Sequence, residues 1–219
     1  WRAALRNREW RLAGGLLLCA IPLIFLSLTA LPEYGWSLKS LRTASFEAMA
    51  ALSTTGFTST RYQNWPDLAL FALTILMLIG GGTGSTAGGI KQYRVYLLLK
   101  AVGWELRKRL LPRRAVVKHQ VWTGSQWQEI DAEELVAIAA FVVFYLLAYA
   151  VGVMTFVACG YNLRDSLFEM ASSISTIGLS VGITSPTAPA LIRITQRAAM
   201  ALGRLEFFVV IFGLARLLR

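Results

Sequence analysis

Ser53-Thr54-Thr55-Gly56-Phe57 recurs in similar form 122 residues later as Ser175-Thr176-Ile177-Gly178-Leu179. In this gapless register, five of the eleven positions that start at residue 46 are identical: Phe46 and Phe168, Glu47 and Glu169, Ser53 and Ser175, Thr54 and Thr176, Gly56 and Gly178. Self-similarity at a fixed offset predicts an internal repeat.

Each copy predicts a short helix that runs into its glycine-containing turn. Thr43 falls on Asp165 in the same register, and both residue types cap helix N-termini. From this cap to Ser53 is about ten residues, or roughly 15 Å of helix, which is half the thickness of a bilayer. In a membrane protein, a half-length helix of this kind directs backbone carbonyls toward an ion.

The composition places the chain among membrane proteins. Hydrophobic residues make up 56% of it, and the mean hydropathy is +0.55. Residues 12–31 and 135–159 are uncharged runs of 20 and 25 residues, each long enough to cross a bilayer. No His, Cys or carboxylate constellation in the sequence suggests an enzyme. Because Trp1 begins inside a basic flank, we expect the chain to be part of something longer.

The net charge of +10 follows membrane topology and does not predict nucleic-acid binding. If sides alternate with each span, 15 of the 22 Lys and Arg residues fall on one side and 6 on the other, with Arg204 left inside a span. The positive-inside rule then makes both termini and the central linker cytoplasmic.

The predicted organisation is two span–pore-helix–span units joined by a basic linker. The first unit is 1–99, with spans at 12–31 and from Leu68, and the second is 134–219, with spans at 135–159 and 189–214. The linker, 100–133, is expected to hold a small hairpin at 116–130. Both units have the same orientation, so an axis along the membrane normal relates them, which suits a central pore.

The second span runs into a stretch of ten residues, 80–89, that holds six of the chain's 18 glycines: Gly80, Gly81, Gly82, Gly84, Gly88 and Gly89. Each would cost a helix about 1 kcal/mol relative to Ala, so the helix is predicted to break over residues 80–91. Irregular backbone at that depth must be buried or line a wet cavity. Close packing of small residues is the alternative.

The two turns suit cation chemistry. Backbone carbonyls can replace the water around a cation without a net charge that would trap it. Gly56 and Gly178 permit the positive φ that turns carbonyls inward, and the half-helices aim their negative dipole ends at the same place.

At this point the chain resembles a known family. Its span, pore helix, Thr-x-Gly turn and span are followed by Gly84-Ser85-Thr86-Ala87-Gly88-Gly89-Ile90-Lys91 and, in the second unit, by Gly203-Arg204-Leu205-Glu206. This pattern is similar to the Trk/Ktr/HKT superfamily of potassium-translocating subunits, in particular to its bacterial TrkH and KtrB members. Those proteins carry four repeats in a pseudo-fourfold, potassium-channel-like pore. This chain matches the third and fourth, so an N-terminal half with two further repeats is expected outside it.

The resemblance implies roles for particular residues. Potassium would pass a filter of backbone carbonyls formed by Thr54, Thr55, Gly56, Phe57, Thr176, Ile177, Gly178 and Leu179. An intramembrane gate would consist of Gly80, Gly81, Gly82, Gly84, Gly88, Gly89, Lys91 and Arg204. The family further implies a homodimer in a bacterial or archaeal cell (inner) membrane. It also implies a cytoplasmic RCK-type ring (TrkA or KtrA) that carries the regulatory nucleotide, so no cofactor is expected in this chain.

Three charged residues lie within the predicted membrane segments: Arg204 in a span, and Glu47 and Glu169 in the half-helices. The register places Arg204 opposite Gly82, so we expect Arg204 to hydrogen-bond carbonyls of the glycine segment or to reach cavity water. A salt bridge to another helix is the alternative. Glu47 and Glu169 are expected to begin the half-helices and to support them through the N-terminal dipole.

Two other functions remain open from the residues. A carrier-type secondary transporter also uses re-entrant hairpins and broken helices, but its repeats are inverted. A non-conducting half-subunit that acts only after assembly is the third possibility. The sequence leaves the coupling ion open.

Overall fold

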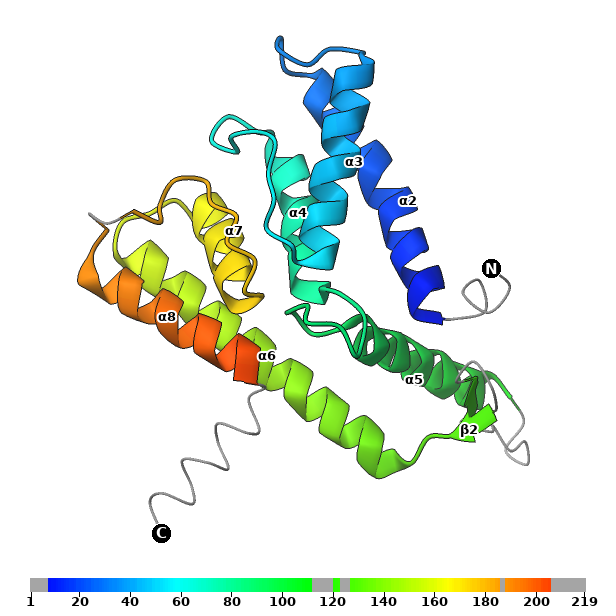
Figure 1. The fold of residues 1–219 in the computed structure, drawn as a ribbon. Coiled ribbons are helices and arrows are strands. Elements are labelled where there is room, and N and C mark those ends of the chain that lie inside the picture. Colours follow the sequence, from blue (N-terminus) through cyan, green and yellow to red (C-terminus); the bar gives the residue numbers. More distant parts are fainter. Residues whose placement is uncertain (1–7, 112–119, 123–126, 186–187, 206–219) are drawn as a thin grey trace.

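The computed structural model describes residues 8–111, 120–122, 127–185 and 188–205. This part of the chain is mainly helical, with one small hairpin (Figure 1). Its elements, in order, are α2 (Arg8–Thr29), α3 (Leu38–Ser53), α4 (Asp67–Ile79), α5 (Gln92–Leu110), β1 (Gln120–Trp122), β2 (Trp127–Glu129), α6 (Ala132–Ala158), α7 (Leu163–Ile174) and α8 (Ala190–Leu205).

The helices gather into two groups of three. Helices α2, α3 and α4 pack on one another, and α7 packs against both α6 and α8 (Figure 1). Contact between α4 and α7 joins the two groups. In each group a long helix is followed by a short helix and then by a third, and the starts of α4 and α8, at Asp67 and Ala190, are 123 residues apart.

Two helices of the described chain are long and apolar enough to cross a membrane. They are α2, with 22 residues, and α6, with 27. They overlap the predicted spans 12–31 and 135–159. Large apolar side chains such as Leu18 and Met154 are more than 60% exposed on them, as expected where a helix faces lipid. Residues 206–214 of the last predicted span lie outside the described residues.

The short helices begin earlier than the sequence suggested. The N-cap of α3 is Ser37, whose hydroxyl accepts a hydrogen bond from the Ser40 amide at 3.3 Å, and the N-cap of α7 is Asn162. The predicted caps Thr43 and Asp165 instead lie inside the helices. With 16 residues, α3 is about 24 Å long rather than 15 Å.

The Gly-rich segment, residues 80–91, interrupts the helix as predicted, and we call it the Gly-rich loop. It doubles back, because the amides of Ile90 and Lys91 donate to the carbonyls of Leu78 and Ile79, both at 2.9 Å. The returning part of the loop passes so close to its start that a Cβ on Gly80 would lie 2.1 Å from the Gly88 carbonyl oxygen. Glycine is therefore required where the loop closes on itself.

The linker forms the predicted hairpin. Strands β1 and β2 are antiparallel, with Val121 opposite Gln128. Val121 and Ile130 pack with Leu97 and Trp104 of α5 and Ile138 of α6 in a small separate core, which holds the hairpin where α5 and α6 meet. The hairpin tip at 123–126 lies outside the described residues.

Candidate functional site: two Thr-x-Gly turns and the Gly-rich loop

Both short helices end in the same backbone motif. The Thr54 amide donates to Ala51 and the Thr55 amide to Ala50, at 3.3 and 3.2 Å, which is the hydrogen-bond pattern of a Schellman motif. The second copy repeats the pattern 122 residues later, from Thr176 to Ser173 at 3.1 Å and from Ile177 to Ser172 at 2.9 Å. We call residues 54–57 the first turn and residues 176–179 the second turn.

The backbone of the two turns is left-handed at matching positions. Gly56 and Gly178 have φ of 76° and 92°, which confirms the predicted positive φ. Thr54 and Thr176 are also left-handed, with φ of 56° and 55°. A β-branched residue rarely adopts this conformation, and strain of this kind concentrates at functional sites. Sequence reasoning missed the threonines because glycine is the usual residue at this position.

The two turns contact each other directly. A Cβ on Gly56 would lie 2.1 Å from the carbonyl oxygen of Ile177, so the second turn presents a carbonyl to the first. A Cβ on Gly178 would meet no atom of the described chain within 4 Å. Phe57 is exposed, whereas Leu179 is buried. Glycine is therefore required at position 56 by the lack of space for a side chain and by the positive φ. At position 178 it is required by the positive φ alone.

One residue of the Gly-rich loop touches both turns. The Gly88 amide donates to the Thr54 hydroxyl at 3.0 Å. A Cβ on Gly88 would lie 2.0 Å from the Ser175 carbonyl oxygen, immediately before the second turn. The loop is thus packed against the ends of both short helices, a long-range contact that the sequence pattern did not indicate.

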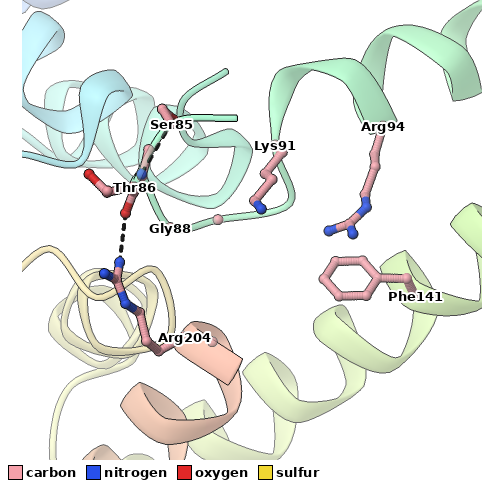
Figure 2. Close-up of a pocket in the computed structure, with 10 residues that line it drawn as sticks. Ser85, Thr86, Gly88, Lys91, Arg94, Phe141 and Arg204 are labelled. Carbon is pink, nitrogen blue, oxygen red and sulfur yellow. Dashed lines mark hydrogen bonds between the residues drawn. The ribbon is translucent and has the colours of Figure 1, made fainter. Parts of the chain in front are cut away.

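Arg204 reaches the same loop from α8. Its Nη1 donates a hydrogen bond to the Thr86 carbonyl oxygen at 2.7 Å (Figure 2). The expectation that Arg204 would bond carbonyls of the glycine segment is confirmed. One residue earlier, a Cβ on Gly203 would lie 1.8 Å from the Ile174 carbonyl oxygen, so α8 is packed tightly against the end of α7.

A cavity of about 220 Å³ lies between the Gly-rich loop, α6 and α8. Arg204 lines it together with Lys91 and Arg94 (Figure 2). The Arg94 guanidinium lies 3.9 Å from the centre of the Phe141 ring, an attractive contact between a cation and an aromatic face. Three cationic side chains therefore line this cavity.

The remaining glycines of the loop differ in what they do. Gly80 and Gly89 lie where the loop closes, and a Cβ on Gly81 would lie 2.4 Å from the Ala87 Cβ. Gly82 lies beside the Glu9 carboxylate of α2, which also accepts a hydrogen bond from the Thr83 amide at 3.2 Å. Gly84 has open space around it and is required by its φ of 85°.

Glu47 and Glu169 do not support helix N-termini, and that expectation was wrong. Because α3 and α7 start earlier than predicted, both glutamates lie in the middle of their helices. They are 0% and 1% exposed and turn toward the segments that follow the two turns. In the described part of the chain, no three His, Cys, Asp or Glu side chains come together as a metal site.

Comparison with known proteins gives a consistent result. Residues 37–218 match the family model of TrkH, described as a cation transport protein. An uncharacterized cation transporter of Methanocaldococcus jannaschii is 36% identical over 78% of this chain, and the Trk system potassium uptake protein TrkH of Halomonas elongata is 31% identical over 80%. The crystal structure of the potassium transporter TrkH from Vibrio parahaemolyticus superposes with a TM-score of 0.79, at 25% identity over 96% of this chain.

The fold therefore places the chain in a class of membrane proteins whose family model is described as cation transport proteins. The chain belongs to the TrkH family. It spans 35% and 36% of the length of the two relatives and 44% of the Vibrio chain.

Proposed function

We propose that this chain supplies two of the four filter turns, and the gate, of a potassium-translocating subunit in a cell membrane. The observation that carries the proposal is the recurrence of one left-handed Thr-x-Gly backbone at Thr54–Gly56 and Thr176–Gly178, in two turns that touch. Relatives named as potassium uptake proteins supply the substrate class. By the resemblance, these turns are the third and fourth filter turns of the complete protein.

Backbone carbonyls are the ion ligands in this account. The filter residues are Thr54, Thr55, Gly56, Phe57, Thr176, Ile177, Gly178 and Leu179. Positive φ at two positions of each turn redirects successive carbonyls, and neutral oxygens hold a dehydrated cation without trapping it. Helices α3 and α7 end at the turns, so their negative dipole ends add attraction for a cation.

The Gly-rich loop and Arg204 form the gate. The loop is packed against both turns through Gly88, and the bond from Arg204 to Thr86 secures it from α8. Lys91 and Arg204 add positive charge beside the path. Glycines at Gly80, Gly81, Gly82, Gly84, Gly88 and Gly89 let the loop change its backbone angles when the pore opens.

The complete transporter needs further parts. Two turns cannot surround an ion, so an N-terminal half with two further repeats would close the ring. The resemblance also supports a homodimer, a cytoplasmic RCK-type ring that binds nucleotide, and a multi-pass topology with both ends of this chain cytoplasmic. The linker hairpin, which packs on α5 and α6 through its buried side chains, provides the surface that we assign to that ring.

Transport by the complete protein tests the proposal. The full-length protein, reconstituted in liposomes, should take up rubidium tracer in place of potassium down a gradient, and sodium should compete poorly. Protein-free liposomes and this chain alone serve as controls. Equal uptake of sodium and rubidium, or no uptake by a folded full-length protein, would contradict the assignment.

A further inference from the structure

Two buried carboxylates each accept hydrogen bonds from the segment that follows one of the turns. Glu47 and Glu169 are 0% and 1% exposed. A carboxylate removed from water is very costly unless its oxygens are well hydrogen-bonded. The hydrogen-bond donors of the two carboxylates therefore show which parts of the chain the glutamates hold in place.

The Glu47 carboxylate bonds the chain just after the first turn. Its Oε1 accepts hydrogen bonds from the Ser59 amide at 2.8 Å and the Ser59 hydroxyl at 2.9 Å. The Thr58 hydroxyl lies 3.4 Å from this oxygen, but its single proton is donated to the Thr60 carbonyl oxygen at 2.8 Å. Its Oε2 accepts from the hydroxyl of Tyr62, whose side chain is itself buried.

The Glu169 carboxylate does the same after the second turn. Its Oε1 accepts from the Val181 amide at 3.0 Å, from the Ile183 amide at 3.1 Å and from the Ser180 hydroxyl. Its Oε2 accepts from the Thr184 hydroxyl at 2.8 Å. The Thr184 oxygen accepts in turn from the Gln196 amide nitrogen at 2.6 Å, which leaves its proton for the carboxylate.

The two sets of contacts correspond at the offset of 122 residues. Thr58 matches Ser180, Ser59 matches Val181 and Tyr62 matches Thr184. Where Ser59 becomes Val181, the side-chain donor is lost but the backbone amide still bonds the carboxylate. Both copies thus keep one arrangement, in which Oε1 accepts from a backbone amide and a hydroxyl and Oε2 accepts from a hydroxyl, although the residues that supply these donors differ.

The carboxylates are not placed to bind the ion themselves. Glu47 accepts three hydrogen bonds from the protein and Glu169 accepts four, and an ionised carboxylate has about four acceptor sites. Most of this capacity is therefore used by the backbone and hydroxyl donors. What it controls is the position of the chain, and its first backbone contact comes only two residues after Phe57 or Leu179.

We propose that Glu47 and Glu169 are positioning residues that anchor the outgoing end of each filter turn and thereby set the discrimination between potassium and sodium. This inference rests on the proposed function. A turn held at one end by its Schellman motif and at the other by a buried carboxylate keeps its carbonyls at a fixed spacing. If one anchor is lost, the carbonyls move inward and coordinate a smaller cation.

Substitutions in the full-length protein distinguish the hydrogen bonds that hold the turns from the negative charge of the carboxylates. In Glu47→Gln and Glu169→Gln, the remaining oxygen can stay on the backbone amides, while the new NH₂ donates to a hydroxyl oxygen that can accept. Glu47→Ala and Glu169→Ala remove the anchor. We expect the alanine variants to lower the ratio of rubidium to sodium uptake about tenfold, which corresponds to about 1.4 kcal/mol of discrimination, and the glutamine variants to stay within about threefold of wild type.

Glu105→Ala is the matched control, because Glu105 is an exposed residue of α5 that pairs with Arg109 at 3.3 Å. It should leave the uptake ratio unchanged. If an alanine variant is not recovered folded, Glu47→Asp keeps the charge but withdraws the oxygens by one methylene, and it should lower the ratio as well.

The outcomes distinguish the two claims. A wild-type protein that does not select rubidium over sodium overturns the proposed function, and the anchoring role with it. A selective wild-type protein whose folded alanine or aspartate variants keep the wild-type ratio overturns the anchoring role alone. Glutamine variants that lose selectivity as fully as the alanine variants would also contradict it, because the backbone contacts would then not be what matters.

Discussion

The Arg204 guanidinium donates a hydrogen bond to the carbonyl oxygen of Thr86 at 2.7 Å, across 118 residues of sequence. It joins α8, which remains helical through Leu205, to the segment where the corresponding helix of the first group breaks after Ile79. The contact therefore connects the two halves of the chain at a point where one helix is broken and the corresponding helix continues.

Removal of this contact should release the loop. We expect Arg204→Ala in the full-length protein to raise potassium flux, because both a positive charge and the bond that secures the loop are lost. Arg204→Lys should stay nearer to wild type, since it keeps the charge. Tracer uptake by proteoliposomes with matched protein content measures the difference. A folded Arg204→Ala protein with wild-type or lower flux would show that Arg204 is not a barrier.

Gly88 should tolerate no side chain. In Gly88→Ala the new Cβ would lie 2.0 Å from the Ser175 carbonyl oxygen, so the loop or the second turn must shift. We expect a lower melting temperature in detergent and altered flux. Gly103→Ala is the control, because its Cβ would meet nothing within 4 Å and alanine favours a helix by about 1 kcal/mol. If the two variants melt alike, the contact between the loop and the second turn is looser than described.

A buried pair of hydroxyl groups includes that of Ser175, the residue that precedes the second turn. The Tyr145 hydroxyl lies 2.8 Å from the hydroxyl of Ser175, and both residues are buried. Tyr145→Phe should cost about 1–3 kcal/mol of stability, because it leaves a buried polar group without this partner. The double variant Tyr145→Phe with Ser175→Ala should recover part of that loss, and a double-mutant cycle measures the coupling. Strictly additive effects would mean that the two hydroxyls do not interact.

Arg164 links the two helix groups through the start of α4. Its Nε lies 3.0 Å from the Asp67 carboxylate, and its Nη2 donates to the Trp65 carbonyl oxygen. Asp67 is largely exposed, so Asp67→Asn should cost less than about 1 kcal/mol. Arg164→Met should cost more, because the Trp65 carbonyl also loses its donor. Melting temperatures of the two variants compare them, and equal losses would assign the whole effect to the ion pair.

The sequence predicted the features that depend on local chemistry. Six glycines in ten residues were enough to place the helix break after Ile79, and the Thr-x-Gly pattern was enough to predict positive φ at Gly56 and Gly178. The offset of 122 residues also indicated a contact between Arg204 and the Gly-rich loop, because it pairs Arg204 with Gly82. These inferences needed no knowledge of how the helices pack.

Features that depend on distant contacts could not be predicted. The choice of Ser37 and Asn162 as caps falls outside the repeated core, where several residues are equally able to cap a helix. That error of a few residues moved Glu47 and Glu169 from mid-helix to a helix start and hid their role. The contact of Gly88 with both turns joins segments more than 30 residues apart, so no local pattern encodes it.

The most direct test of the central claim is the ratio of rubidium to sodium uptake by the full-length protein carrying Gly56→Ser. A side chain at Gly56 would meet the Ile177 carbonyl oxygen at 2.1 Å and must adopt a φ of 76°, so the carbonyls of both turns should shift. We predict a fall of about tenfold or more, which corresponds to about 1.4 kcal/mol, and a smaller fall for Gly178→Ser, where only φ is strained. Wild-type ratios in both folded variants would contradict a filter at these turns.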